Sequence, residues 1–391
     1  MSSTSDVVIV GGGINGVSIA YQLAKQGVKT SLIEKSFIAG GPTGHSSAII
    51  RQHYSNEVTA RMAHSSMQVW QNFDQIVGGD GGYTKAGFFM TVQPKDIEGL
   101  KANIKMQQSI GIDTSFVTAQ EIAEVEPYLE SAGMGGGAYE PDGGYCDPSM
   151  AANAFVAAAK RHGATIKIGV AATKIIVEGD RVVGLETSEG KISAGKVIIA
   201  AGPWSPKLLG HLGVEVPITT SRIKIGLFKR PDEFANHAVW ADFISQIYAR
   251  PETGGMMLVG SISPDEAEDM VSDPDSFNPK ADLDIIAEFA QSTTERFPIM
   301  EQAQVASNYA SLYDITPDWH PILDEIPRYA GLYICAGGSG HSFKLAPATG
   351  EMMASLLING KRPDDDINLF SFDRFTTGNQ VQGKYEYSIV G

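Results

Sequence analysis

The sequence predicts an α/β fold organised around a parallel sheet. An apolar strand, a glycine-rich turn and a helix follow one another at residues 7–26, and the same order returns at 331–358. Strands that alternate with helices in this way are typical of a parallel sheet with helices on its faces. A strand-rich stretch at 216–312 indicates a second region of different texture. Because the two strand–turn–helix units lie near opposite ends of the chain, we expect them to converge on one long ligand.

The N-terminal unit carries a dinucleotide-binding pattern. Val7–Val10 is an unbroken β-branched run, which suits a parallel strand buried on both faces. Gly11, Gly13 and Gly16 then follow the G-x-G-x-x-G spacing. The first glycine permits a tight turn, the second lets the backbone approach a pyrophosphate, and the third lets the helix pack on the strand. A helix is expected from Ile14 to Gln26, with its positive N-terminal end directed at the phosphates.

The second strand, Thr30–Ile33, ends on Glu34. A carboxylate about 20 residues beyond the glycines is placed to bind a ribose hydroxyl. Its negative charge disfavours a 2′-phosphate and therefore NADP as the cofactor, which leaves FAD and NAD open at this point.

The remaining elements are read from periodicity and turn residues. A helix with an apolar stripe is expected at 56–76, and Asp147-Pro148 marks the N-cap and first position of another helix that ends at Gly163. Further helices are expected at 95–110, 119–126 and 347–358, and strands at 85–92, 165–168, 172–178, 181–187, 191–193, 197–201 and 331–336. The acidic stretch Pro264–Asp284 is interpreted as a solvated surface loop, with a lid or docking surface as the alternative.

Composition limits the class of partner and compartment. The 391 residues carry a net charge of −15, which argues against nucleic acid or an anionic membrane as a partner. The two cysteines, Cys146 and Cys335, have no metal-ligand spacing, so no metal site and a reducing, cytoplasmic setting are expected. No basic n-region with an apolar run begins the sequence, and no apolar run reaches the length of a membrane span, so neither a signal peptide nor a transmembrane segment is expected.

Several motifs together resemble the D-amino-acid oxidase superfamily of flavoproteins, above all the sarcosine oxidases and dehydrogenases, including the β subunits of multi-subunit sarcosine oxidase. The motifs are the three glycines with Glu34, Ile49-Ile50-Arg51, Tyr313-Asp314-Ile315-Thr316-Pro317-Asp318 and Gly340-His341-Ser342-Phe343-Lys344. The resemblance implies FAD as cofactor. It implies a discontinuous, Rossmann-like FAD-binding domain at 1–82, 145–215 and 313–391, and an α+β substrate-binding domain with a mixed, largely antiparallel sheet at 83–144 and 216–312.

The resemblance also implies a reaction and the residues that support it. A secondary or N-methyl amino acid would be oxidised at its C–N bond by hydride transfer to flavin N5, giving an imine that hydrolyses. Arg51 and Lys344 would hold the substrate carboxylate, and the planar guanidinium suits a bidentate grip on such a group. Tyr313 would lie near the flavin, Tyr248 over the substrate, and His341 would orient its loop.

The cofactor-binding residues expected on the same basis come from both glycine motifs and the loops between them. They are Gly11, Gly13, Ile14, Asn15, Gly16, Glu34, Lys35, Gly44, His45, Ser46, Ser47, Ala172, Ala201, Gly202, Trp204, Gly338, Gly340, His341, Ser342, Phe343 and Lys344.

The sequence departs from this family at positions close to the flavin. Ser311 replaces the cysteine that holds the flavin of monomeric sarcosine oxidases, so non-covalent FAD is expected; a covalent link through His45, as in dimethylglycine dehydrogenases, is the alternative. Ala48 and Leu258 stand where those oxidases carry an arginine and a lysine, which favours a dye or a protein over oxygen as electron acceptor. Ser342 replaces a glycine close to the ring.

Three other functions compete with this interpretation. One is an FAD enzyme acting on a D-amino acid, proline or hydroxyproline. Another is a flavin subunit that works only within a larger complex. An NAD-only dehydrogenase would leave the C-terminal glycine motif without a role.

Overall fold

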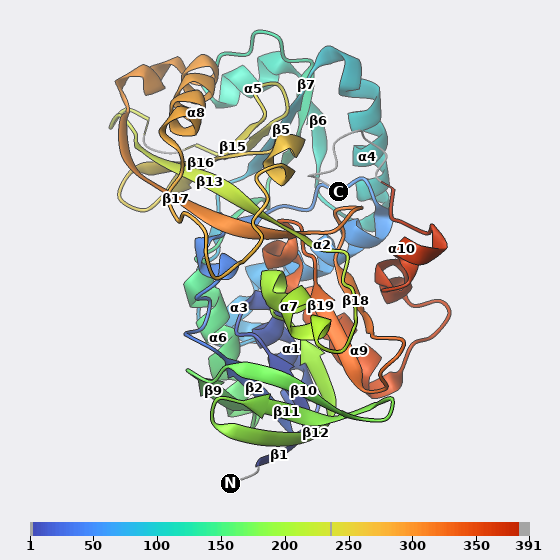
Figure 1. Cartoon of the computed structure of the whole chain (residues 1–391). Coiled ribbons are helices and arrows are strands. Elements are labelled where there is room, and N and C mark those ends of the chain that lie inside the picture. The colour runs from blue at the N-terminus through green and yellow to red at the C-terminus, as the bar shows by residue number, and fades with distance from the viewer. Residues whose placement is uncertain (1–2, 235–236, 383–391) are drawn as a thin grey trace.

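Two large sheets organise the chain, and they lie in separate lobes (Figure 1). The computed structural model describes residues 3–234 and 237–382. One sheet is rich in parallel strand pairs and the other is mixed and largely antiparallel, so the fold class expected from the sequence is confirmed. Along the described chain no helix combines the length and apolar character that crossing a membrane requires.

The parallel-rich sheet has the strand order β10-β11-β12-β1-β2-β9, with β19 beside β12 and β18 beside β19. Its strands are β1 (Ser3–Val10), β2 (Thr30–Glu34), β9 (Thr165–Ile168), β10 (Ala172–Glu178), β11 (Arg181–Thr187), β12 (Gly190–Ile199), β18 (Ile322–Glu325) and β19 (Leu332–Ala336). Val8 and Ile9 point to opposite faces of β1 and neither has exposed surface. This burial on both faces explains the unbroken β-branched run.

The strand β12 corrects the sequence analysis, which expected separate strands at 191–193 and 197–201. β1 pairs with β12 in parallel from Ser3 opposite Ile192 to Val10 opposite Ile199. Because β1 hydrogen-bonds along nearly the whole of β12, the small residues at 194–195 do not interrupt the strand.

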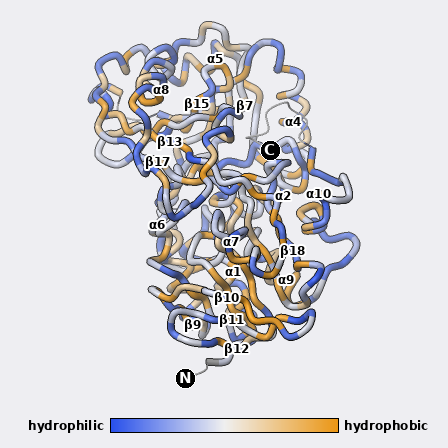
Figure 2. Tube along the Cα trace, viewed as in Figure 1, coloured by the Kyte–Doolittle hydropathy of each residue, from blue (hydrophilic) through white to orange (hydrophobic). Residues whose placement is uncertain are grey.

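Helices cover this sheet and supply most of its apolar partners. α1 (Ile14–Lys25) packs against α6 (Pro148–Arg161) and α9 (Ser342–Asn359), and α2 (Glu57–Gln71) packs on α9. The Asp147 carboxylate accepts the Met150 N–H at 2.8 Å, as expected for the N-cap of α6. Hydrophobic colouring concentrates along α1, α9 and the strands beside them, whereas the peripheral loops are hydrophilic (Figure 2).

The mixed sheet forms the other lobe, in the order β17-β13-β16-β15-β14-β5-β7-β6. Its strands are β5 (Phe88–Val92), β6 (Ser115–Val117), β7 (Gly136–Glu140), β13 (Thr219–Lys229), β14 (Val239–Asp242), β15 (Ile247–Glu252), β16 (Met256–Ser261) and β17 (Gln304–Ile315). The helices of this lobe are α4 (Ile97–Ile110), α5 (Ala119–Val125) and α8 (Leu283–Arg296). A small sheet joins β3 (Ile49–Ile50), β8 (Gly144–Tyr145) and β4 (Thr84–Lys85).

The domain segments expected from the sequence stay a prediction, and the strands are distributed among them as follows. Strands of the parallel-rich sheet fall in 1–82, 145–215 and 313–391, and strands of the mixed sheet fall in 83–144 and 216–312, except the end of β17. Short helices complete the chain: α3 (Phe73–Ile76), α7 (Ser205–Gly210) and α10 (Arg374–Thr377).

Two helices and one strand differ from the sequence analysis. The helix expected at 56–76 breaks at Asn72 into α2 and α3. The helix α8 was missed within the strand-rich stretch, although Ile286 and Phe289, both buried, recur at helical spacing. The strand expected at 85–92 is divided where Gly87 takes a positive φ of 78°.

The helix α9 begins at Ser342, not at Pro347, which lies inside it. A proline inside a helix removes one backbone donor and disturbs the neighbouring hydrogen bonds. Here side chains satisfy the disturbed groups: the Trp70 indole N–H donates to the Lys344 carbonyl at 3.0 Å, and the Ala348 N–H donates to the Ser66 hydroxyl at 3.2 Å. The helix therefore continues through the proline.

Candidate active site

A cavity of about 620 Å³ lies at the carboxyl ends of β1, β2 and β12. The first turns of α1 and α9 form part of its wall. This volume is within the range of small-molecule and cofactor pockets, and the carboxyl edge of a parallel sheet is where such ligands bind.

The N-terminal glycine turn has the geometry that the motif demands. Gly11 has a φ of +116°, and a Cβ there would lie 2.3 Å from the Ala200 carbonyl oxygen. A Cβ on Gly16 would lie 2.1 Å from the Gly11 oxygen. Gly16 thus permits the close approach of helix and strand but does not itself line the cavity.

Two helix N-termini meet at the cavity. The Asn15 side-chain amide donates to the Ser342 hydroxyl at 3.1 Å, which ties the start of α1 to the start of α9. Both ends carry partial positive charge and N–H groups without partners inside the helix, the arrangement that suits a pyrophosphate. The strand–turn–helix units at the two ends of the chain are therefore neighbours in space.

Glu34 lies at the cavity wall, where it also shapes the turn. One carboxylate oxygen accepts the Gly12 N–H at 2.7 Å and the other accepts the Ser36 N–H at 2.8 Å. Together with the two helix N-termini, this carboxylate gives the donor set and charge that a dinucleotide requires, so the residues present fit FAD.

Most of the residues expected to bind the cofactor line this cavity. Those that do are Gly11, Gly13, Ile14, Asn15, Glu34, Lys35, His45, Ser46, Ser47, Ala172, Ala201, Gly202, Trp204, Gly340, Ser342 and Phe343. Gly16, Gly44 and Gly338 do not line it; a Cβ on Gly44 would meet the Ala39 oxygen at 2.4 Å, and one on Gly338 would meet the Ser342 hydroxyl at 1.8 Å. His341 and Lys344 belong to a second cavity.

The wall residues that the sequence analysis missed include Thr43, Asp314 and Asp275. The Thr43 hydroxyl accepts the Ile14 N–H at 3.0 Å. Asp314 accepts the Gly337 N–H at 2.7 Å, and burial raises its pKa to about 6. Asp275 belongs to the acidic stretch on the other lobe and has no local sequence signal that would place it here.

The Asp275 carboxylate joins the two lobes at the cavity mouth. It binds the Lys35 ammonium at 2.6 Å, the Trp204 indole N–H at 2.7 Å and the Lys207 ammonium at 3.0 Å. The Lys35 ammonium also lies 4.0 Å from the centre of the Trp204 ring. The acidic stretch is thus a surface loop, part of which covers one edge of the large cavity.

The second cavity, of about 60 Å³, adjoins the first, and Ser47, Tyr313 and Gly340 line both. Every residue expected to act on the substrate lines it: Arg51, Tyr248, Tyr313, His341 and Lys344. Its remaining walls include apolar side chains from both lobes, among them Ile49, Phe88 and Ile262.

Two buried cations face this small cavity. The Arg51 side chain, from a residue 6% exposed, donates to the His53 carbonyl and stacks 4.5 Å from the Tyr54 ring centre. Lys344 is 8% exposed, and burial together with the Arg51 charge holds its pKa well below the usual value. Within 3–234 and 237–382 no carboxylate forms an ion pair with either side chain. Two buried cations that form no ion pair in the described ranges are suited to an anionic ligand.

His341 lies beside these cations. Its Nδ1 is 3.2 Å from the Tyr54 hydroxyl. Burial and the charges of Lys344 and Arg51 hold its pKa well below the usual value, so the ring is neutral and a weak base. This geometry favours an orienting role for His341.

Each of the two cavity tyrosines lies against a glycine. A Cβ on Gly260 would lie 2.4 Å from the Tyr248 hydroxyl, and one on Gly340 would lie 2.7 Å from the Tyr313 ring. Any larger residue at either position would displace a tyrosine from the cavity wall.

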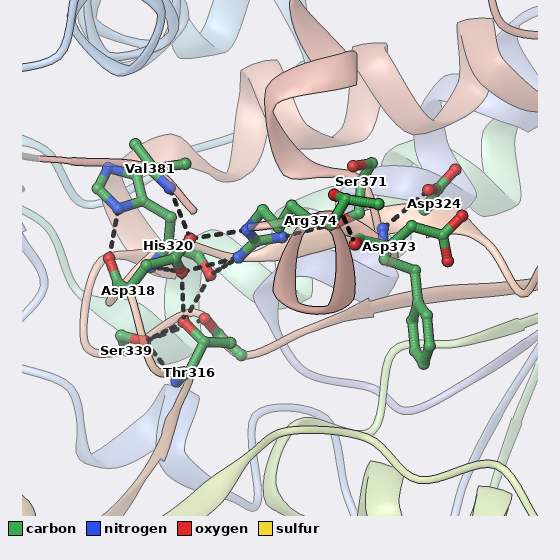
Figure 3. A network of polar contacts seen from close by, with 12 residues as sticks. Thr316, Asp318, His320, Asp324, Ser339, Ser371, Asp373, Arg374 and Val381 are labelled. Carbon is green, nitrogen blue, oxygen red and sulfur yellow. Dashed lines mark hydrogen bonds and ion pairs between the residues drawn. The ribbon is translucent and has the colours of Figure 1, made fainter. Parts of the chain in front are cut away.

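The turn before His341 is braced by the C-terminal segment (Figure 3). Ser339 lines the small cavity, and its hydroxyl accepts the Thr316 N–H at 3.2 Å. The Thr316 hydroxyl donates to the His320 carbonyl at 2.7 Å, and that carbonyl also accepts from Arg374 at 2.7 Å.

The positions that depart from the sarcosine oxidases have these surroundings. Ser311 lines the large cavity. Leu258 is 2% exposed and packs in the apolar cluster that contains Tyr248. Ala48 is 1% exposed with a φ of +50°. The His45 Nδ1 lies 3.1 Å from the Gly41 carbonyl oxygen.

A protein-family model described as "DAO: FAD dependent oxidoreductase" matches residues 6–356. The sarcosine oxidase subunit beta of Rhodobacter capsulatus is 25% identical over 368 residues, which cover 92% of this chain and 86% of that protein. The mitochondrial sarcosine dehydrogenase of Mus musculus is 25% identical over 384 residues. That alignment covers 96% of this chain and 42% of the relative, so the chain spans less than half the length of the mouse protein.

Among solved structures, the L-proline dehydrogenase from P. horikoshii superposes with a TM-score of 0.88 and 26% sequence identity. The superposition covers 97% of this chain and 99% of that one.

Proposed function

The chain belongs to the DAO family of FAD-dependent oxidoreductases, and on that premise we propose that it oxidises the C–N bond of a small secondary or N-methyl amino acid. The observation that carries this proposal is the pair of buried cations, Arg51 and Lys344, that face one small cavity without an ion-pair partner in the described chain. A substrate carboxylate would complete that arrangement.

The side chains of the cavity have distinct tasks in this reaction. The Arg51 guanidinium presents a planar fork to the carboxylate, and the Lys344 ammonium adds a second positive charge. Two cations near the substrate amine disfavour its ammonium form, so the neutral amine is selected. Tyr248 and Tyr313 bound the cavity and orient the substrate. FAD, when bound, supplies the acceptor for the hydride of the substrate C–H bond.

The volume of the small cavity supports a small substrate. At roughly 10–15 Å³ for each water, 60 Å³ holds about four to six waters, which compares with the roughly six non-hydrogen atoms of sarcosine. Apolar walls from Ile49, Phe88 and Ile262 suit a methyl group or a ring better than a charged side chain.

Proline is the second candidate substrate, and the superposition with an L-proline dehydrogenase favours it. Proline is also a secondary amine with a carboxylate, so the same grip would serve. D-amino acids and hydroxyproline are alternative substrates, which the substrate panel below compares with sarcosine and proline. A role as the flavin subunit of a larger assembly is supported by the likeness to a sarcosine oxidase β subunit.

An anaerobic substrate panel tests the proposal. The purified protein should show flavin bands near roughly 370 and 450 nm, and sarcosine or proline should bleach the second band faster than D-alanine or a primary L-amino acid. Arg51→Ala should retain the flavin spectrum and lose the bleaching at the same substrate concentration. Faster bleaching by D-alanine, or none by any secondary amine, would contradict the proposal.

We propose that the FAD is held without a covalent bond. Ser311 offers no thiol, and acid precipitation should therefore release the yellow colour into the supernatant. Colour that stays in the pellet and is lost in His45→Ala would instead assign a covalent bond to His45. Native mass measurement from the source organism would show whether other subunits accompany the chain.

A further inference from the structure

A buried carboxyl group that interacts electrostatically with Arg51 has no role in the proposed function. Glu140 is the last residue of β7 in the mixed sheet and has no exposed surface. One of its carboxylate oxygens accepts the Gln52 N–H at 2.7 Å. The other oxygen has no hydrogen-bond partner among the residues that the structure describes.

Glu140 supports the chain segment that carries Arg51. Residues 51–55 follow β3 without regular secondary structure, and all of them are buried. Buried backbone groups outside helices and sheets need other partners. Glu140 provides one at Gln52, and the Gln107 side-chain amide donates to the Tyr54 carbonyl at 2.9 Å. The lobe of the mixed sheet therefore fixes the segment that carries Arg51, through Glu140 of β7 and Gln107 of α4.

Burial raises the pKa of Glu140 to about 7, the Gln52 and His53 N–H groups and the Arg51 charge act in the opposite direction, and Asp142 raises it further. Two tyrosines, Tyr54 and Tyr83, also interact with Glu140, whose charge raises the pKa of each. The adjacent strands β5 and β6 contain no titratable side chain. The charged residues of the packed helices α4 and α5 are exposed: Glu98, Lys101, Lys105, Glu121 and Glu124. His53, in the same segment as Arg51, is kept neutral because burial and Arg51 lower its pKa to about 3.

We propose that Glu140 is a positioning residue and counter-charge for Arg51, and that a substrate carboxylate and a proton on Glu140 bind together. The inference rests on the proposed function, in which Arg51 receives that carboxylate. An ionised Glu140 fixes the Gln52 backbone and balances the guanidinium in the empty site. When a second carboxylate arrives at Arg51, two negative charges would share one buried cation, so the protonated form of Glu140 is favoured.

Two substitutions separate the charge of Glu140 from its hydrogen bond. Glu140→Gln keeps an oxygen that can accept the Gln52 N–H but removes the charge, and Glu140→Met removes both. Glu126→Gln is the matched control, because Glu126 is also a buried glutamate that accepts a backbone N–H, from Ala238 at 2.9 Å, in the same lobe. The probe is propionate, a small carboxylate without an amine, and its dissociation constant is read from the perturbed flavin spectrum.

The ratio of dissociation constants between wild type and Glu140→Gln is the measured quantity. The two proteins should bind propionate equally near pH 6, where Glu140 is protonated. Near pH 8.5 the Gln variant should bind about tenfold more tightly, the effect of one pKa unit. Taking the ratio removes the contribution of Lys344, which both proteins share. Glu140→Met should bind more weakly than Glu140→Gln at every pH, and Glu126→Gln should follow wild type.

A ratio that does not change with pH would overturn the proposal, as would equal binding by Glu140→Met and Glu140→Gln. If the Glu140 variants do not fold, calorimetry of the Lys344→Met holoenzyme in two buffers of different ionisation enthalpy decides, because propionate binding near pH 7 should then take up protons without a contribution from Lys344. No uptake would overturn the inference. Wild-type protein that binds no propionate at all, with a normal flavin spectrum, would instead contradict the proposed function.

Discussion

Two arginines of this molecule are almost equally buried and have opposite surroundings. Arg374, in the C-terminal segment, is 1% exposed; its guanidinium binds both Asp318 carboxylate oxygens, at 2.8 and 2.9 Å, and two backbone carbonyls (Figure 3). Arg51 is 6% exposed, donates to the His53 carbonyl and has no carboxylate partner in the described part of the chain.

The difference separates a structural charge from a binding charge. A buried ion pair whose groups are all satisfied holds chain segments in place, and it loses stability when one partner is removed. A buried cation that lacks its anion is costly unless a ligand supplies the counter-charge. The lysines repeat the contrast, since Lys224 binds Asp269 at 2.7 Å whereas Lys344 faces the small cavity without an ion pair in the described ranges.

Removal of the paired arginine should have the largest effect. Arg374→Ala leaves the Asp318 carboxylate buried and unpaired, so we expect the free energy of unfolding in urea to fall by about 3–5 kcal/mol. Propionate affinity of the remaining folded protein should stay near the wild-type value. Arg362→Ala is the control, because its ion pair with Asp365 is exposed on the arginine side and its loss should leave stability unchanged. An Arg374→Ala protein as stable as wild type would show that the Arg374–Asp318 ion pair does not stabilise the fold.

Removal of the unpaired cations should act on binding instead. Arg51→Ala and Lys344→Ala should each weaken substrate or propionate binding by about 1.5–3 kcal/mol, the scale of a hydrogen bond to a charged group. Stability in urea and flavin content should change little, because no ion pair is lost from the folded protein. Arg51→Lys should restore binding only in part, since the bidentate fork is missing. An Arg51→Ala variant that loses stability but binds propionate normally would show that Arg51, like Arg374, is a structural residue.

The unpaired lysine should also make binding depend on pH. Its pKa in the folded protein is lowered by burial and by Arg51. Anion binding requires the ammonium form, so propionate affinity should fall as pH rises through that lowered pKa. Between that pKa and the pKa of an exposed lysine the unfolded chain holds more protons, so Lys344 makes stability rise with pH across the same interval. The dissociation constant of propionate, measured as a function of pH, tests this expectation. Lys344→Met should remove the loss of affinity that accompanies deprotonation of Lys344, and a pH profile equal to that of wild type would contradict the expectation.

The comparison extends to the reaction of the reduced protein with oxygen. Lys224 is bound to Asp269, and Leu258 and Ala48 carry no charge. A positive charge in a site without water stabilises the superoxide anion that oxygen forms in its first reduction step. We therefore expect slow reoxidation of the reduced protein by air and faster reoxidation by a dye, measured by stopped flow. Leu258→Lys should accelerate the reaction with oxygen. If air reoxidises the wild-type protein as fast as it turns over substrate, Lys344 or another cation is sufficient to support the reaction with oxygen.

The smallest effect is expected at the exposed ion pairs of Asp275. Its partners Lys35 and Lys207 are 45% and 61% exposed, and such pairs contribute little in water. Asp275→Asn should accelerate FAD release by less than about fivefold, with the difference vanishing at high salt. Release followed by flavin fluorescence tests this. A hundredfold acceleration of FAD release would contradict this expectation, because it would show that Asp275 stabilises the contact between the lobes by more than exposed ion pairs usually contribute.

The sequence alone determined the parts of this protein that depend on local chemistry. The Val7–Val10 run, the glycine spacing and Glu34 predicted a strand, a turn and a carboxylate that do line one cavity. The motif that ends in Arg51 and the one that contains Lys344 predicted two cations, which the fold brings to a single small cavity. These features can be predicted from the sequence because they depend on the backbone geometry and the side-chain types of residues that are neighbours in the chain.

Only the tertiary structure decided which charges are paired. The sequence around Arg374 does not predict its ion pair with Asp318. The sequence around Arg51 predicts neither the buried Glu140 in its surroundings nor that Arg51 forms no ion pair in the described chain. Asp275 reaches Lys35 and Trp204 across two lobes, and α8 forms where its Ile286 face can be buried. Ion pairing and burial depend on segments that are distant in sequence and meet only after folding. The role of a buried charge is therefore set by the fold.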